Sequence, residues 1–126
     1  MPFFLNTNNI IPLMIEVYHN ARCGKSRECL AFLNEANVEY QIINYLQDAP
    51  TVDELRTLIQ KLGIPPLELV RQKEKIWINN YAGRHLNDDE ILLAMAEHPI
   101  LIERPIVVNG DKAVIARPFA KAFDIV

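Results

Sequence analysis

The sequence predicts an α/β domain built on a mixed four-stranded sheet with helices packed on it. A strand–helix–strand pattern opens the chain between residues 14 and 45, helical segments fill its middle, and two β-branched runs flank an Asn-Gly pair near its end. The chain has 126 residues, which suits one domain with one hydrophobic core. We therefore expect residues 14–126 to form a single domain.

The opening pattern begins with a short apolar strand at residues 14–18 and continues with a helix over about residues 24–36. A second strand is expected at residues 40–45. A strand–helix–strand unit of this length forms two parallel strands joined by a right-handed crossover. The apolar stripe of the helix consists of Cys29, Phe32, Leu33 and Ala36.

The middle of the chain carries clear signals for where helices start and stop. Thr51 and Glu54 have the spacing of a capping box, and an amphipathic stripe follows them. Gly63 is expected to end that helix, since Pro65 and Pro66 prevent its continuation. A short helix at residues 66–71, partial helix in residues 72–86, and a helix capped by Asn87 and Glu90 that ends before Pro99 complete this region.

The chain ends with a β-hairpin signal. Residues 106–108 and 113–115 are β-branched or apolar, and Asn109-Gly110 lies between them. The whole order is then strand, helix, strand, helical insertion and hairpin, which is that of a thioredoxin-like architecture. In such a sheet Cys23 follows the C-terminal end of the first strand, where open α/β sheets bind their ligands.

Composition excludes several classes of function. The net charge of −3 argues against a general nucleic-acid binder, and no apolar run reaches the roughly 18 residues that a membrane span needs. Residues 1–13 have no basic leader or cleavage site, so we interpret them as an extension without a catalytic role rather than a signal peptide. With two cysteines and no such signal, we expect a cytoplasmic protein without a disulfide.

Cys23 is the strongest candidate for a reactive residue. It lies where the first strand gives way to the first helix, so unpaired backbone N–H groups and the positive end of the helix dipole favour its thiolate. Arg22, Lys25, Arg27 and His19 are close in sequence, and we expect them to add positive charge. Cys29 is expected in the core, on a different side of the helix from Cys23.

Three arginines are candidates for binding an anion. Arg104 precedes the first hairpin strand and Arg117 follows the second, so both can lie at one edge of the sheet. Arg71 ends the short helix of the insertion. Guanidinium groups bind tetrahedral oxyanions well, although spacing alone favours a solvated surface position for each of these residues and does not bring the three together.

The remaining candidates have two readings each. His19 is either a group that acts on the thiol or a polar strand-end residue that binds backbone. The Ser26 hydroxyl either bonds the sulfur or satisfies backbone donors. Pro105 follows Arg104, and a cis bond there has a low base rate. The histidines and cysteines lack the paired spacing of metal ligands, so we expect no metal site.

Longer motifs resemble those of the glutaredoxin-coupled arsenate reductase family, which has a thioredoxin-like fold. The matching segments are Tyr18-His19-Asn20-Ala21-Arg22-Cys23-Gly24-Lys25-Ser26-Arg27, Leu69-Val70-Arg71, His98-Pro99-Ile100-Leu101-Ile102-Glu103-Arg104-Pro105-Ile106-Val107-Val108 and Ala116-Arg117-Pro118. They span most of residues 14–126, and their order and spacing are specific.

The resemblance implies that Cys23 attacks arsenate or a similar small oxyanion. By the same resemblance His19 favours the thiolate and Ser26 places a hydroxyl near the sulfur, while Arg104-Pro105 takes the position of the family's cis-proline. No cofactor is bound. Glutathione is the co-substrate, and the partner glutaredoxin resolves the mixed disulfide. The oxyanion is bound by Arg71, Arg104 and Arg117.

Two alternatives remain compatible with the same residues. One is a glutathione-dependent thiol oxidoreductase that acts on another substrate through Cys23. The other is a non-enzymatic regulator that binds RNA polymerase, similar to the Spx-type proteins of a neighbouring branch. Those regulators often carry a Cys-x-x-Cys switch, and Ser26 stands at its second position here.

Overall fold

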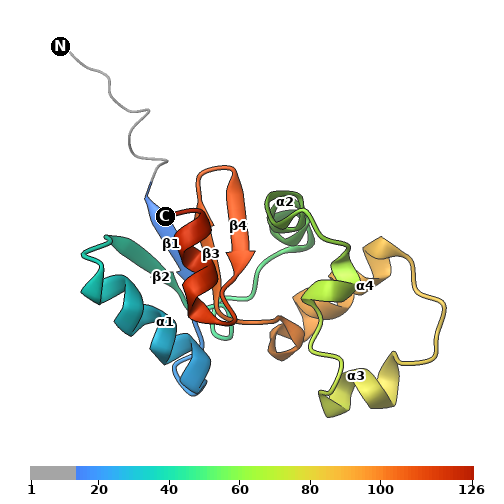
Figure 1. Cartoon of the computed structure of the whole chain (residues 1–126). Helices are drawn as coiled ribbons and strands as arrows, with labels where there is room; N and C mark the ends of the chain where they lie inside the picture. Colours follow the sequence, from blue (N-terminus) through green and yellow to red (C-terminus); the bar gives the residue numbers. More distant parts are fainter. Residues whose placement is uncertain (1–13) are drawn as a thin grey trace. The chain divides into compact units, whose positions relative to one another are not determined.

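The computed structural model describes residues 14–126, so the expected role of residues 1–13 lies outside the described chain. The described residues divide into two compact units (Figure 1). The first unit contains residues 14–43 and Arg104–Val126, and the second is Asn44–Glu103. The second unit is the helical insertion that the sequence predicted before the final hairpin.

The first unit is built on a four-stranded sheet with the strand order β2-β1-β3-β4. Strand β1 (Ile15–Tyr18) pairs in parallel with β2 (Tyr40–Ile43), and helix α1 (Gly24–Glu35) connects them. Strand β3 (Ile106–Asn109) is antiparallel to both β1 and β4 (Lys112–Ile115). The prediction of a mixed four-stranded sheet is confirmed, although β2 ends two residues earlier than the predicted residue 45.

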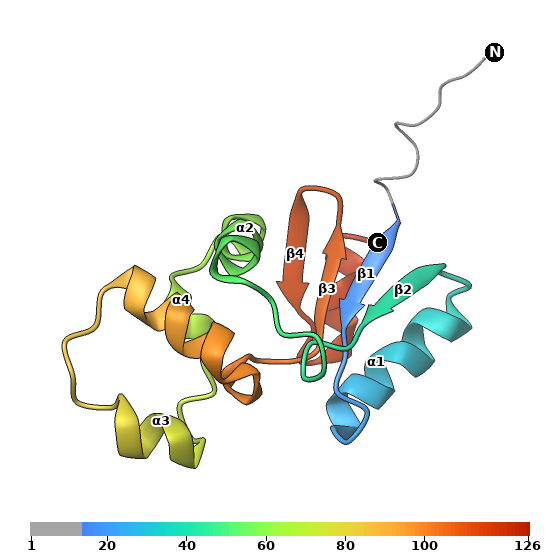
Figure 2. The same ribbon diagram turned by 180° about the vertical axis from the view of Figure 1, so that it is seen from behind.

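One face of this sheet is covered by α1 and by the 3₁₀ helix η4 (Phe119–Asp124). Both helices lie in front of the strands in Figure 1 and behind them in Figure 2. Val17 and Val107 are partners across β1 and β3, so their side chains reach the same face. The buried cluster under the helices contains Val17, Cys29, Leu33, Val107, Ala116 and Ala122.

The final hairpin turns between the two runs that the sequence predicted. Asn109 still belongs to β3 and pairs with Lys112, so Gly110 and Asp111 are the central residues of the turn. Gly110 has a φ of 64°, in the left-handed region. Glycine at the first central position with positive φ is the requirement of a type II′ turn, whose twist suits antiparallel strands.

The second unit consists of helices and their connections. These are α2 (Val52–Leu62), η2 (Pro66–Leu69), α3 (Lys75–Asn80), α4 (Asp88–Glu97) and η3 (Pro99–Leu101). Helix α4 contacts α2, η2 and η3, so it forms the centre of the unit. None of the helices within residues 14–126 is long and apolar enough to cross a membrane.

Both predicted capping boxes are present. The Thr51 hydroxyl accepts from the backbone N–H of Glu54 (3.1 Å), and the Glu54 carboxylate accepts from that of Thr51 (2.9 Å). Asn87 and Glu90 exchange the same pair of bonds at the start of α4. Gly63 ends α2 with a φ of 67°, a conformation that glycine adopts without a steric penalty.

We predict that Thr51→Ala lowers the free energy of unfolding by about 1 kcal/mol, because it leaves a helix-terminal N–H without its acceptor. The measurement is urea denaturation followed by circular dichroism. Thr57→Ala is the matched control: Thr57 is an exposed residue inside the same helix, where we expect a change within about 0.5 kcal/mol. Equal effects of the two substitutions would contradict a specific role for the cap.

Candidate active site

Cys23 is the N-cap residue of α1, at the end of the loop that leaves β1. Its backbone is extended, with φ −95° and ψ 122°, and its carbonyl accepts the first helical bond from Arg27 N–H (3.1 Å). Asn20 shapes the loop, since its carbonyl accepts from Cys23 N–H (3.0 Å) and its side-chain oxygen from Arg22 N–H (2.9 Å). The half-buried sulfur thus lies at the helix N-terminus, as the sequence predicted.

The pKa of the Cys23 thiol lies below its ordinary value, as the net result of opposing influences. Partial burial is the largest single influence, and it raises the pKa. It is outweighed by the backbone N–H groups of Ser26 and Lys25, which donate to the sulfur, and by the Arg104 guanidinium, which acts through its charge and a hydrogen bond. The thiolate is therefore favoured by helix-terminal N–H groups and one arginine distant in sequence.

Strand pairing explains why Arg104 reaches Cys23. Tyr18, the last residue of β1, is the antiparallel partner of Ile106, the first residue of β3. Arg104 is two residues before Ile106, so the segment that enters β3 lies beside the loop that leaves β1.

The cations that are neighbours of Cys23 in sequence do not play the part expected of them. Among the described residues, the only charge that lowers the pKa of Cys23 is that of Arg104; those of Arg22, Lys25 and Arg27 do not contribute. Arg27 folds back to donate to the Ala21 carbonyl (2.8 Å), and the Lys25 ammonium lies 3.8 Å from the Glu28 carboxylate. Proximity in sequence therefore gave the wrong source of positive charge.

Ser26 is fully buried beneath the loop. Its hydroxyl accepts a long hydrogen bond from the backbone N–H of Asn20 (3.4 Å), while its own N–H donates to the Cys23 sulfur. The side chain thus satisfies a backbone donor of the loop, and the main chain makes the contact with the sulfur.

His19 is also buried, and its backbone N–H donates to the Ile43 carbonyl (3.1 Å). Burial lowers the pKa of its imidazole, and the charge of Arg27 lowers it further. Within residues 14–126, its buried Nδ1 has no hydrogen-bond partner. Burial therefore favours the neutral ring, which argues against His19 as a source of positive charge for the thiol.

The other hairpin arginine lies beside Arg104. Arg117 Nη1 donates to the Arg104 carbonyl (3.3 Å), and the neighbouring Ala116 N–H donates to the Pro105 carbonyl (2.9 Å). The peptide bond between Arg104 and Pro105 is cis, and so is that between Arg117 and Pro118, which the sequence analysis did not consider. The two arginines thus lie at one edge of the sheet, with Arg104 reaching the sulfur.

Arg71 belongs to the second unit, where three contacts hold it. Its backbone N–H donates to the Leu101 carbonyl (2.7 Å), beside the antiparallel bridge between Val70 and Ile102. Its guanidinium forms an ion pair with Glu74 (3.0 Å) and donates to the Ile100 carbonyl (3.3 Å). Glu74 was not predicted from the sequence, where its i, i+3 spacing from Arg71 is the one available signal.

Cys29 is a free cysteine in the core, as predicted, and burial raises the pKa of its thiol to about 11. It is therefore an inert thiol, in contrast to Cys23. Within residues 14–126, no group of three or more His, Cys, Asp or Glu residues could hold a metal ion.

The sheet is thioredoxin-like, and it carries one activated cysteine at a strand–helix junction. An arginine contacts the sulfur of that cysteine. These features place the chain in the class of thioredoxin-fold proteins with a single activated thiolate. A family model described as ArsC family matches residues 18–122. An arsenate reductase of Haemophilus influenzae is 42% identical over 108 residues, which cover 84% of this chain and 93% of that protein. The chain therefore belongs to the ArsC family.

Two further relatives match most of the chain. The solved structure of an arsenate reductase from Vibrio cholerae matches with a TM-score of 0.86 at 41% identity, covering 90% of this chain and 98% of that one. An Escherichia coli K12 protein named only as uncharacterized protein YfgD is 41% identical over 114 residues, covering 89% of this chain and 96% of its own length.

We predict that Arg104→Gln raises the pKa of Cys23, because it removes both the charge and the guanidinium donor that favour the thiolate. The rate of Cys23 alkylation rises with pH through this pKa, so the midpoint of the profile should move to higher pH. Arg22→Gln is the control and should leave the midpoint in place. A larger shift for Arg22→Gln would contradict the assignment of Arg104.

Proposed function

We propose that this protein reduces arsenate to arsenite with Cys23 as the nucleophile. The observation that carries the proposal is the contact between the Cys23 sulfur and Arg104 in a member of the ArsC family. A thiolate supplies the electron pair that attacks arsenic, and an adjacent guanidinium attracts the oxyanion and stabilises the charge that develops on its oxygens. Named arsenate reductases among the relatives support the choice of substrate.

The reaction proceeds by two substitutions and balances in atoms and electrons. The Cys23 thiolate first displaces one arsenate oxygen, which leaves as water after protonation, and an S–As bond forms. The thiolate of glutathione then attacks the Cys23 sulfur, and the electron pair of the S–As bond stays on arsenic. Arsenic(V) becomes arsenic(III), arsenite leaves, and Cys23 remains as a mixed disulfide with glutathione.

Glutaredoxin is the proposed partner that returns Cys23 to its thiol. A cysteine within the chain would make an external thiol unnecessary, but Cys29 is fully buried, with a thiol pKa raised to about 11. Ser26 occupies the position that a resolving cysteine takes in a Cys-x-x-Cys motif. The need for external thiols suits the reducing cytoplasm.

The three arginines are proposed to bind the oxyanion together. Arg104 lies on the sulfur, and Arg117 is held beside it through the Arg104 carbonyl. Arg71 is preorganised by Glu74 and the Ile100 carbonyl, which use two of its five N–H groups and leave the others for a ligand. Its part in the site rests on the family resemblance.

A second candidate is a glutathione-dependent thiol oxidoreductase. The observation that favours it is that groups within the first unit, the first-turn N–H groups and Arg104, are enough to lower the pKa of Cys23. In that case the substrate is a glutathionylated thiol, and Arg104 serves the thiolate alone.

Purified protein supplied with arsenate, glutathione and glutaredoxin should release arsenite, and Cys23→Ser should release none. Cys29→Ala is the matched control, since it removes the buried cysteine and should retain activity. The measurement is arsenite formed over time, separated from arsenate by chromatography. Absence of arsenite from the wild-type protein would refute the proposed substrate.

Arg117→Gln separates the two candidate functions. Arg117 does not lower the pKa of Cys23, so the thiolate should survive the substitution, whereas oxyanion binding loses one guanidinium. We expect KM for arsenate to rise by about tenfold, the loss of a charged hydrogen bond of roughly 1.4 kcal/mol. An unchanged KM for arsenate, together with turnover of glutathionylated substrates, would favour the oxidoreductase.

A further inference from the structure

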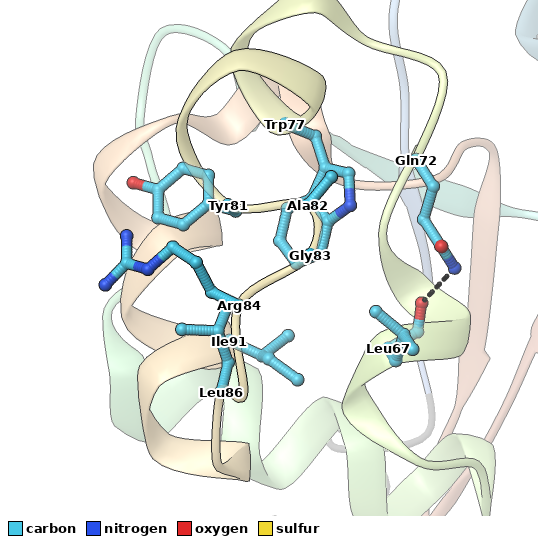
Figure 3. A pocket seen from close by; sticks show the side chains of 9 residues that line it. All are labelled: Leu67, Gln72, Trp77, Tyr81, Ala82, Gly83, Arg84, Leu86 and Ile91. Atoms are coloured by element: carbon cyan, nitrogen blue, oxygen red, sulfur yellow. Dashed lines mark hydrogen bonds between the residues drawn. The ribbon is translucent and has the colours of Figure 1, made fainter.

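The second unit contains a cavity of about 220 Å³ (Figure 3). Its walls come from η2 and the turn that follows it, from α3 and the loop after α3, and from the first turn of α4. None of the residues that line it belongs to the site around Cys23, and the proposed reaction uses none of them. The cavity thus has no role in the chemistry proposed above.

Two aromatic rings and several aliphatic side chains form much of the cavity wall, alongside polar groups. Trp77 and Tyr81 are stacked, with ring centroids 5.3 Å apart and planes inclined by 22°. Leu67 and Ile91 lie across the opening from Trp77 in Figure 3. An engineered apolar cavity of about 150 Å³ binds benzene, so a cavity of this size accommodates one aromatic ring with a short substituent.

The polar side chains at the rim of the cavity favour a ligand with a negative charge. The Arg84 guanidinium lies over the Tyr81 ring, 5.9 Å from its centroid, and donates to the Asn80 carbonyl (2.9 Å). Gln72 contributes an uncharged amide, and no acidic residue of the described chain lines the cavity. A cationic ligand would meet only repulsion from Arg84, whereas an anionic ligand gains a partner.

We propose that this cavity binds a small aromatic carboxylate, with the ring between Trp77 and the leucine and isoleucine side chains and the carboxylate at the Arg84 rim. Such a site is separate from the Cys23 thiolate. The proposed site can be tested independently of arsenate reduction, because binding of the aromatic carboxylate can be measured without turnover.

Trp77 makes the test direct, because it is the only tryptophan of the chain and lines the cavity. Titration with 3-phenylpropionate should change its fluorescence in a saturable way, with a Kd on the order of 1 mM for a ligand of this size. Arg84→Gln should weaken binding of 3-phenylpropionate by about three- to tenfold. Binding of the uncharged 3-phenylpropionamide should change by less than about twofold.

A second pair of variants tests the place of binding. Leu67→Glu puts a carboxylate into the wall of the cavity and should abolish the fluorescence response to 3-phenylpropionate. Leu93→Glu is the matched control, because Leu93 is similarly exposed (48%, against 40% for Leu67) and does not line the cavity. A non-saturable response of the wild type, or equal responses of the two variants, would overturn the proposal. If Leu67→Glu fails to fold, Arg84→Gln decides: equal weakening of acid and amide refutes the charge assignment.

Discussion

The contact between the Cys23 sulfur and its donors is the constraint on which the rest of the site depends. Partial burial alone would hold this thiol protonated, and it is the largest single influence on its pKa. The first-turn N–H groups and the Arg104 guanidinium must together outweigh it. Neither contribution exists in an unfolded chain, since one needs a formed helix N-terminus and the other needs β1 paired with β3. The favoured thiolate is therefore a product of the fold.

This dependence explains which site features could be predicted from the sequence. The position of Cys23 at a helix start is a local property, and local patterns indicated it. The source of positive charge is not local, because Arg104 meets Cys23 only through the Tyr18–Ile106 register. His19 is a neighbour of Cys23 in sequence, but burial lowers the pKa of its imidazole and so disfavours the positive charge that its proximity suggested. Pairing partners and burial are tertiary quantities, and a sequence pattern does not encode them directly.

The same distinction between local and tertiary signals applies to the helices and strands. Both capping boxes and the glycine at the end of α2 followed from short motifs, because each rests on hydrogen bonds within a few residues. The hairpin is present as predicted, and the pairing of Asn109 with Lys112 places its turn at Gly110 and Asp111, between the two predicted runs. Helix α3 covers only part of residues 72–86, where the sequence carried no cap to fix its ends.

The two units contain different groups of the candidate sites. All groups that lower the pKa of Cys23 belong to the first unit, so the thiolate is generated without any residue of the insertion. The insertion holds Arg71 through Glu74 and the Ile100 carbonyl, and it contains the cavity at Trp77. The groups that favour the Cys23 thiolate are therefore unaffected by sequence changes confined to the insertion.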